Sequence, residues 1–299
     1  MSGNLRNINR REFVSGSLAA ATSLAIANSS NADDKKKKYK ICAFEKFIQA
    51  LNYDELGETI ADLGFDGIEA TVRNGGHIEP EKVEDELPKM VAALKKHNVE
   101  ITVMASDINR VDTLSERVLK TAAGLGVKRY RTKYYRYDLK KPVLGQLDEF
   151  RPMLKDLVEL NRDLGMSAVY QNHSGAHVVG ALVWDLHSLI KDYSVKDIGI
   201  AFDIRHATVE GGLAWPVHFN LMQPHLGAVY IKDFKWSGRK PQNVPLGEGQ
   251  VDPKFFEILT SSQYKGPISL HVEYLPKAGT EKNIDALRND LKTLKRLLA

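Results

Sequence analysis

The stretch Ile198-Gly199-Ile200-Ala201-Phe202-Asp203-Ile204-Arg205-His206 predicts a short buried strand that ends in a carboxylate, with an imidazole three residues later. Bulky apolar residues alternate with small ones, and alternate side chains of a strand point to opposite faces. One face is therefore apolar, and the other is small until Asp203. Small residues beneath one carboxylate are typical of a strand that lines the crowded interior of a barrel.

Strand patterns alternate with amphipathic helical patterns along most of the chain. The predicted strands are residues 40–44, 67–72, 100–105, 128–133, 168–172, 198–203, 227–232 and 268–273. The predicted helices are residues 54–63, 81–97, 113–125, 147–164, 183–193, 215–222, 253–262 and 281–298. Eight such pairs without a linker between them predict a single (β/α)₈ TIM barrel. A doubly wound open sheet is the competing architecture, but the Gly-rich phosphate turn that it usually carries is absent.

The first residues resemble an export signal. Arg10-Arg11 precedes a mildly apolar run, residues 14–27, that ends in the small-x-small site Ala25-Ile26-Ala27. The paired arginines resemble the twin-arginine signal, and the run is too short to anchor in a membrane. We expect a signal peptide at residues 1–27, a Lys-rich linker at residues 28–38, a catalytic barrel at residues 39–299 and a periplasmic or otherwise exported protein. A disordered leader with a chance arginine pair is the alternative.

Composition narrows the range of partners. The chain has 299 residues and a net charge of +4. Removing residues 1–27 takes away three arginines and one glutamate, which leaves about +2 and gives no reason to expect a nucleic-acid partner. The single Cys42 excludes an intrachain disulfide. The oligomeric state stays open, with a homo-oligomer as one option.

Polar side chains gather at the carboxyl ends of the predicted strands, where the active site of such a barrel lies. The alternation points these side chains inward: Glu69, Gln171, His173, Tyr230, Lys232, Ser269, His271 and Glu273. The fourth strand ends in Arg131 and Lys133, although Tyr130 and Thr132 could face inward instead. Burying so many ionisable groups costs free energy unless they pair or bind something. The pattern therefore predicts a functional pocket.

Carboxylate, imidazole and amide groups that converge on one point suit a divalent cation such as Mn²⁺, Mg²⁺ or Zn²⁺. Such an ion polarises a carbonyl and lets a nearby base remove the adjacent proton. Each residue also has a structural alternative. Asp203 could cap a helix, His206 could pack a loop, and Glu69 could form a salt bridge with Arg131 or Lys133.

Motifs at successive strand ends are similar to those of the xylose-isomerase-like sugar isomerase/epimerase superfamily. The resemblance covers nearly the whole chain from Lys40. It rests on Gly64-Phe65-Asp66-Gly67-Ile68-Glu69, Tyr170-Gln171-Asn172-His173, Phe202-Asp203-Ile204-Arg205-His206, Tyr230-Ile231-Lys232-Asp233, Leu246-Gly247-Glu248-Gly249 with Val251-Asp252, and Gly266-Pro267-Ile268-Ser269-Leu270 running to Glu273.

The resemblance implies a metal held by Glu, Asp, His and Glu from the fifth to the eighth strands. Asp203 matches this pattern, and His206 matches the histidine that follows it. Gln171 stands at the first Glu position and Tyr230 at the His position. His271 stands at the second Glu position, with Glu273 two residues later. Either His271 and Glu273 rebuild a metal site with Asp203, or the metal has been lost.

The segment Tyr170-Gln171-Asn172-His173-Ser174-Gly175-Ala176 also resembles the fifth strand of inosose dehydratase, a lyase of the same superfamily. Elimination and epimerisation both begin with removal of a proton α to a carbonyl. We therefore expect an exported isomerase or epimerase that acts on a small unphosphorylated sugar or keto-sugar. A lyase or hydratase acting on a keto-sugar or 3-keto-glycoside is one alternative, and a non-catalytic carbohydrate-binding protein is another.

The expected roles of the individual residues follow from this reading. Asp203, His271, Glu273 and Gln171 would hold the metal. His173, His206 and Glu273 would contact substrate or transfer protons, and Lys133 or Lys232 would stabilise the oxyanion. Glu69, Arg131 and Tyr230 would contact the substrate.

Overall fold

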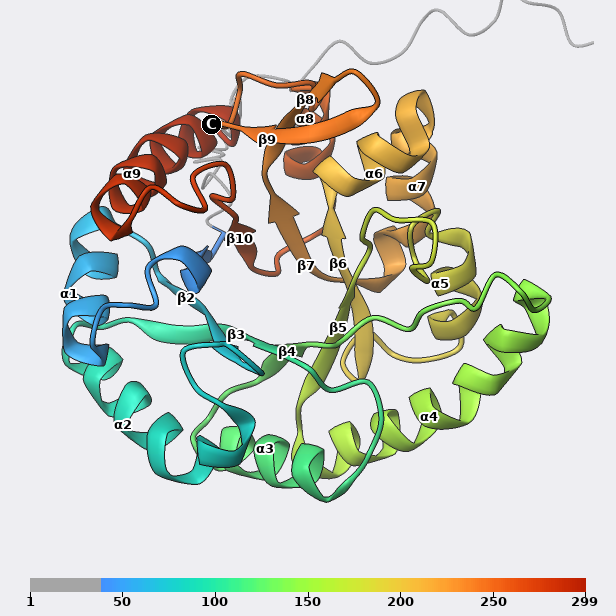
Figure 1. Cartoon of the computed structure of the whole chain (residues 1–299), viewed down its shortest axis with the longest axis horizontal. Coiled ribbons are helices and arrows are strands. Elements are labelled where there is room, and N and C mark those ends of the chain that lie inside the picture. The colour runs from blue at the N-terminus through green and yellow to red at the C-terminus, as the bar shows by residue number, and fades with distance from the viewer. Residues whose placement is uncertain (1–38) are drawn as a thin grey trace, which may run out of the picture. The chain divides into compact units, whose positions relative to one another are not determined.

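The computed structural model describes residues 39–299, so the predicted signal peptide and linker lie outside the described residues. Eight parallel strands close into a barrel with helices around it (Figure 1), in the order β1-β10-β7-β6-β5-β4-β3-β2. The barrel strands are β1 (Ile41–Phe44), β2 (Gly67–Val72), β3 (Glu100–Ser106), β4 (Arg129–Arg131), β5 (Ser167–Gln171), β6 (Ile198–Asp203), β7 (Leu226–Ile231) and β10 (Ile268–Leu270). The predicted TIM barrel is confirmed.

The helices between the strands also follow the predicted pattern. They are α1 (Tyr53–Leu63), α2 (Val83–Lys96), α3 (Thr113–Gly124), α4 (Val143–Leu164), α5 (Trp184–Ile190), α6 (Ile204–Gly211), α7 (Trp215–Met222), α8 (Lys254–Ser261) and α9 (Thr280–Leu297). Short 3₁₀ turns lie at Glu45–Phe47, Pro80–Lys82, Gly212–Ala214 and Gln223–His225. The sequence pattern missed α6, which begins directly after the last residue of β6.

Local sequence signals set the helix ends. Asn52 caps α1 in a capping box with Glu55, and Asp112 caps α3 in the same way with Ser115. The left-handed Gly64 closes α1 with a φ of 82°, a conformation in which glycine carries no side-chain penalty. These signals place the helix boundaries close to where the sequence predicts them.

The barrel interior beneath the site is small and apolar. A cluster of buried residues fills it: Val103, Val169, Ala201, Ala228 and Tyr230. A Cβ atom at Gly199 would lie 2.5 Å from the carbonyl oxygen of His225, so only glycine fits this closely packed point of β6. The small face predicted for β6 therefore faces the interior and leads up to Asp203.

A hairpin follows β7 that the sequence pattern did not predict. Strands β8 (Asp233–Ser237) and β9 (Lys240–Val244) pair antiparallel as a separate two-stranded sheet. Asp233 accepts hydrogen bonds from the backbone N–H groups of Gly247, Gly249 and Val251, each 3.0 Å long. The Lys-Asp and Leu-Gly-Glu-Gly motifs therefore meet in one place, and they hold the chain directly after Lys232.

Among the described residues, no helix is both long and apolar enough to cross a membrane.

Candidate active site

One group of polar side chains at the carboxyl ends of the strands is fully buried and internally paired. Glu69, at 0 % exposure, accepts hydrogen bonds from Ser269 (2.7 Å), and His271 Nε2 lies 2.8 Å from the same oxygen. Arg131 Nε lies 3.1 Å from the other oxygen as an ion pair. Burial would raise the pKa of Glu69, but Arg131 and His271 outweigh it and lower the pKa to about 2. We call Glu69, Arg131, Ser269 and His271 the Glu69 cluster.

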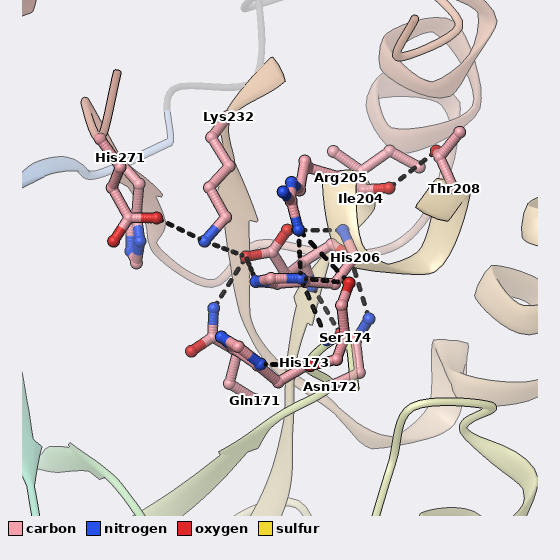
Figure 2. Close-up of polar contacts among 12 residues, drawn as sticks. Gln171, Asn172, His173, Ser174, Ile204, Arg205, His206, Thr208, Lys232 and His271 are labelled. Carbon is pink, nitrogen blue, oxygen red and sulfur yellow. Dashed lines mark hydrogen bonds and ion pairs between the residues drawn. The ribbon is translucent and has the colours of Figure 1, made fainter. Parts of the chain in front are cut away.

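The second group surrounds Asp203 and is drawn in Figure 2. Asp203 caps α6, because its Oδ1 accepts a hydrogen bond from the backbone N–H of His206 at 3.1 Å. Gln171 Nε2–H donates to Asp203 Oδ2 at 2.7 Å, and Lys232 Nζ lies 3.2 Å from the same oxygen. Lys232 also donates to Glu273 at 2.8 Å. We call Gln171, Asp203, Lys232 and Glu273 the Asp203 cluster.

Lys232 is the central cation of the Asp203 cluster. Its side chain is 5 % exposed, whereas that of Glu273 is 17 % exposed. Burial would lower the pKa of Lys232, but Asp203 and Glu273 outweigh it and raise the pKa. Burial would raise the pKa of Glu273, but Lys232 and His271 hold it well below its usual range. The site therefore holds a buried ammonium beside a carboxylate that a ligand can reach.

The amide of Gln171 joins the two clusters in one orientation. Its Oε1 accepts hydrogen bonds from Arg131 and from the Tyr134 hydroxyl, each 2.7 Å long. Because Arg can only donate, the amide oxygen faces Arg131 and the amide N–H faces Asp203. The oxygen of Gln171 is thus turned away from Asp203.

His206 is buried and held neutral. Its Nδ1 lies 3.1 Å from the donating N–H of Ser174 and 2.9 Å from an Arg205 nitrogen, so Nδ1 accepts and the proton resides on Nε2. Nε2 in turn lies 3.6 Å from Asp203 Oδ2. Burial lowers the pKa of His206 well below its usual value, and the cations Lys232 and Arg205 lower it further. The His206 ring is therefore neutral, and its Nε2–H makes no hydrogen bond with a described residue.

His173 carries its proton on Nδ1, whereas His206 carries it on Nε2. Its Nδ1 lies 2.9 Å from the Ser174 carbonyl, which can only accept, so Nδ1 carries the proton. Nε2 makes no hydrogen bond with a described residue, and the ring stacks 4.0 Å from that of His206. Burial, helped by Lys232, lowers the pKa of His173 to about 4. At neutral pH its Nε2 lone pair is free to accept a proton.

The donor groups proposed as metal ligands do not form a cage. Gln171 presents an N–H to Asp203, His271 faces Glu69, and Lys232 lies between Asp203 and Glu273. In the described part of the chain, no three His, Cys, Asp or Glu side chains are arranged to hold a metal ion. A divalent cation shared by Asp203 and Glu273 would have to lie beside the Lys232 ammonium. This donor set does not fit the Mn²⁺, Mg²⁺ or Zn²⁺ expected from the sequence.

Two further residues with predicted roles lie at the edges of the site. Tyr230 is fully buried with its ring 4.6 Å from that of His271, so it forms the floor between the clusters. Lys133 is exposed and lines a side cavity, whereas Arg131 takes the inward position left open for the fourth strand. Tyr130 instead points outward and bonds Asn161 of α4.

Several residues of the site escaped the sequence reasoning. Tyr134 and Ser174 lie in loops that follow a strand, where no period fixes the direction of a side chain, and Arg205 lies in α6, the helix that the sequence pattern missed. Asn172 donates to the backbone oxygen of Asp203 and accepts from its N–H, which ties the ends of β5 and β6 together. The one sequence signal for Asn172 was its place directly after Gln171, a residue predicted to face the site.

The comparisons with known proteins agree with this architecture. The family model described as "Xylose isomerase-like TIM barrel" matches residues 58–295, and the chain belongs to that family. An uncharacterized protein of Methanocaldococcus jannaschii is 25 % identical over 247 residues, which is 76 % of this chain and 81 % of that protein.

Solved structures of two enzymes share the fold. The 3-keto-D-glucoside 4-epimerase of E. coli superposes with a TM-score of 0.65 and 20 % identity, covering 87 % of this chain and 100 % of that one. The probable 3-DHS dehydratase of petrobactin synthesis from Bacillus anthracis gives a TM-score of 0.67 with 16 % identity, over 86 % of this chain and 99 % of that one. The neighbours thus include an epimerase and a dehydratase.

Proposed function

We propose that this protein is an enzyme that removes the proton α to the carbonyl of a small keto-sugar and returns it as an isomerase or epimerase. The observation that carries the proposal is the buried Lys232 ammonium fixed between Asp203 and Glu273. A preorganised cation in a water-poor site stabilises the enolate oxygen that forms when the proton leaves. Lys232 thereby supplies the charge stabilisation that a metal ion would otherwise give.

Two groups can transfer protons on either side of this cation. Glu273 follows β10 and His173 follows β5, and between these strands Lys232 directly follows β7 and Asp203 ends β6. The Glu273 carboxylate stays ionised, and the Nε2 of His173 stays unprotonated at neutral pH. Either base can remove the α proton, and the other, once it has taken up a proton from solvent, can deliver that proton to the opposite face of the carbon.

The remaining residues hold this arrangement in place. Asp203 balances the charge of Lys232, and the backbone N–H of His206 and the side chain of Gln171 fix the carboxylate of Asp203. Because no donor set fits a divalent cation, the proposed steps use only side chains of the chain itself. The expected export supports a free sugar or glycoside as the substrate.

A lyase remains the second candidate, favoured by the proton donor at Lys232 beside the base at Glu273. Elimination needs both a base for the α proton and a donor for the departing hydroxyl. The chemistry would diverge only after the shared enolate has formed. The mass of the product separates the two, because dehydration removes one water and isomerisation leaves the mass unchanged.

The proposal is tested by incubation with a panel of ketohexoses and 3-keto-glucosides in D₂O. We expect deuterium at the carbon beside the carbonyl, detected by NMR and mass spectrometry, and its loss in Lys232→Met. Lys235→Met, an exposed lysine on β8, is the matched control and should exchange at the wild-type rate. Saturable binding of panel sugars without any exchange would overturn the proposal in favour of a carbohydrate-binding protein.

A further inference from the structure

A side cavity of about 190 Å³ adjoins the proposed active site. It shares Arg131 and Tyr134 with the site, and both of these residues bond the Gln171 oxygen. Gln171 in turn contacts Asp203. Two lining residues of the cavity therefore contact the Asp203 cluster directly through Gln171. Its volume is below the roughly 300–1,000 Å³ of a pocket for a whole drug-sized ligand, so it has room for one end of a substrate.

The cavity has an excess of positive charge. Its lining contains one carboxylate, that of Asp107. It also contains four cationic side chains, those of Arg73, Arg131, Lys133 and Arg136. Asp107 accepts a hydrogen bond from the backbone N–H of Asn74 and forms no ion pair with these cations among the described residues. Arg131 is neutralised by Glu69. The other three cations have no ion pair within the described part of the chain.

Arg73 lies beside Arg131 in this cavity, with Glu69 and Asp107 as the nearby opposite charges. It is half-buried, and burial together with the neighbouring Arg131 lowers its pKa. The two guanidinium carbons lie 5.6 Å and 5.0 Å from the centre of the Phe44 ring, so both cations gather around one aromatic side chain. Like charges held together in a partly desolvated place cost free energy unless an anion joins them.

One buried hydroxyl without a partner lies in the wall of this cavity. Thr132 lines it and is 4 % exposed, yet its hydroxyl has no hydrogen-bond partner among the described residues. Buried hydroxyls in folded proteins are almost always paired. This hydroxyl is itself almost fully shielded, so it is an unsatisfied group of the cavity wall and not a contact for a ligand.

We propose that this cavity binds an anionic group of the substrate, so that the enzyme acts on an acidic keto-sugar. The shared chemistry is an oxyanion held by guanidinium groups, which a sugar carboxylate or a phosphate ester can supply. The inference rests on the proposed function, because it places the carbonyl end of the same molecule over Lys232. With its charged end bound in the cavity, the sugar is positioned so that its carbonyl end lies beside the proton-transfer groups.

Binding measured without turnover tests the proposal. The probes are D-glucuronate, D-galacturonate and their 6-phosphate counterparts, glucose 6-phosphate and galactose 6-phosphate, each compared with the neutral hexose by isothermal titration calorimetry. We expect an acidic sugar to bind at least about tenfold more tightly than its neutral partner, since charge-assisted hydrogen bonds to guanidinium groups supply the difference. Comparison of the uronates with the sugar phosphates identifies whether the cavity binds a carboxylate or a phosphate.

Two substitutions locate the effect. Arg73→Met and Arg136→Met should each remove most of the preference for the acid and leave binding of the neutral sugar unchanged. Arg136 is exposed, so its variant should fold even if Arg73→Met does not. Arg288→Met, an exposed arginine of α9, is the control and should behave as the wild type.

Failure of this inference is distinguishable from failure of the proposed function. Equal binding of acidic and neutral sugars, or a preference that survives both substitutions, overturns the anion site even if neutral keto-sugars exchange deuterium. An Arg73-dependent preference for acids without exchange on any keto-sugar sustains the anion site and overturns the proposed chemistry.

Discussion

The Glu69 cluster and the Asp203 cluster lie side by side at the top of one barrel, yet they differ in exposure to solvent. Glu69 is fully buried and meets Ser269, His271 and Arg131. The Asp203 cluster keeps a partly exposed carboxylate at Glu273 beside a buried ammonium. A closed network of charges stabilises the fold, whereas a network with an accessible group can act on a ligand. We therefore propose that the same residue types serve structure in one cluster and chemistry in the other.

The largest effect is expected from replacing Lys232, which belongs to the Asp203 cluster. Lys232→Met should lower kcat by about 10³-fold, because it removes the cation that stabilises the developing oxyanion. It also leaves the buried Asp203 without its ammonium partner, so the melting temperature should fall as well. Kinetics are measured on protein shown to be folded by circular dichroism. Near-normal turnover in a folded variant would contradict the role given to Lys232.

A pair of matched substitutions compares the two carboxylates directly. Glu273→Gln should lower kcat by about 10²-fold with a small change in stability, because it removes an accessible base. Glu69→Gln should lower the free energy of unfolding by about 3–5 kcal/mol, because it breaks a fully buried ion pair. Urea unfolding and steady-state kinetics are measured on both. The reverse pattern would show that the two clusters have been assigned the wrong way round.

The pH dependence sharpens the role of His173. Its folded pKa of about 4 is below the ordinary value of 6.5, so the folded state binds this proton less readily than the unfolded state. The free energy of unfolding should therefore fall as the pH decreases from about 6.5 to about 4. The value of kcat/KM should fall as the pH drops through about 4, where Nε2 becomes protonated. His173→Asn should be slower at neutral pH and should lack this acid limb, and an unchanged limb would exclude His173 as its source.

The smallest expected effect is that of metal removal. Dialysis against EDTA should change turnover by less than about twofold, because the amide N–H of Gln171 and the Lys232 ammonium occupy the surroundings of Asp203. Metal content is measured in parallel by plasma mass spectrometry. Loss of activity on chelation, restored by Mn²⁺, Mg²⁺ or Zn²⁺, would support the metal site predicted from the sequence.

The sequence predicted the barrel well because its strands follow a simple rule. Alternation of bulky and small residues marked β6, and the inward register of β10 placed Ser269 and His271 on one face. The hairpin of β8 and β9 was missed, because its residues are mostly exposed and carry no apolar period. Helix α6 was missed because it follows β6 without a loop.

The chain by itself determined which residues reach the top of the barrel, since the period of a strand fixes the face of each side chain. The partner that each residue meets was decided by the tertiary structure. Glu69 could pair with Arg131 or Lys133, and only the closed barrel brings Arg131 against it. Gln171 could have offered an oxygen to a cation, but Arg131 and Tyr134 take that oxygen and turn the amide N–H toward Asp203. Such choices depend on distances between strands that are far apart in the sequence, and a linear pattern carries no record of them.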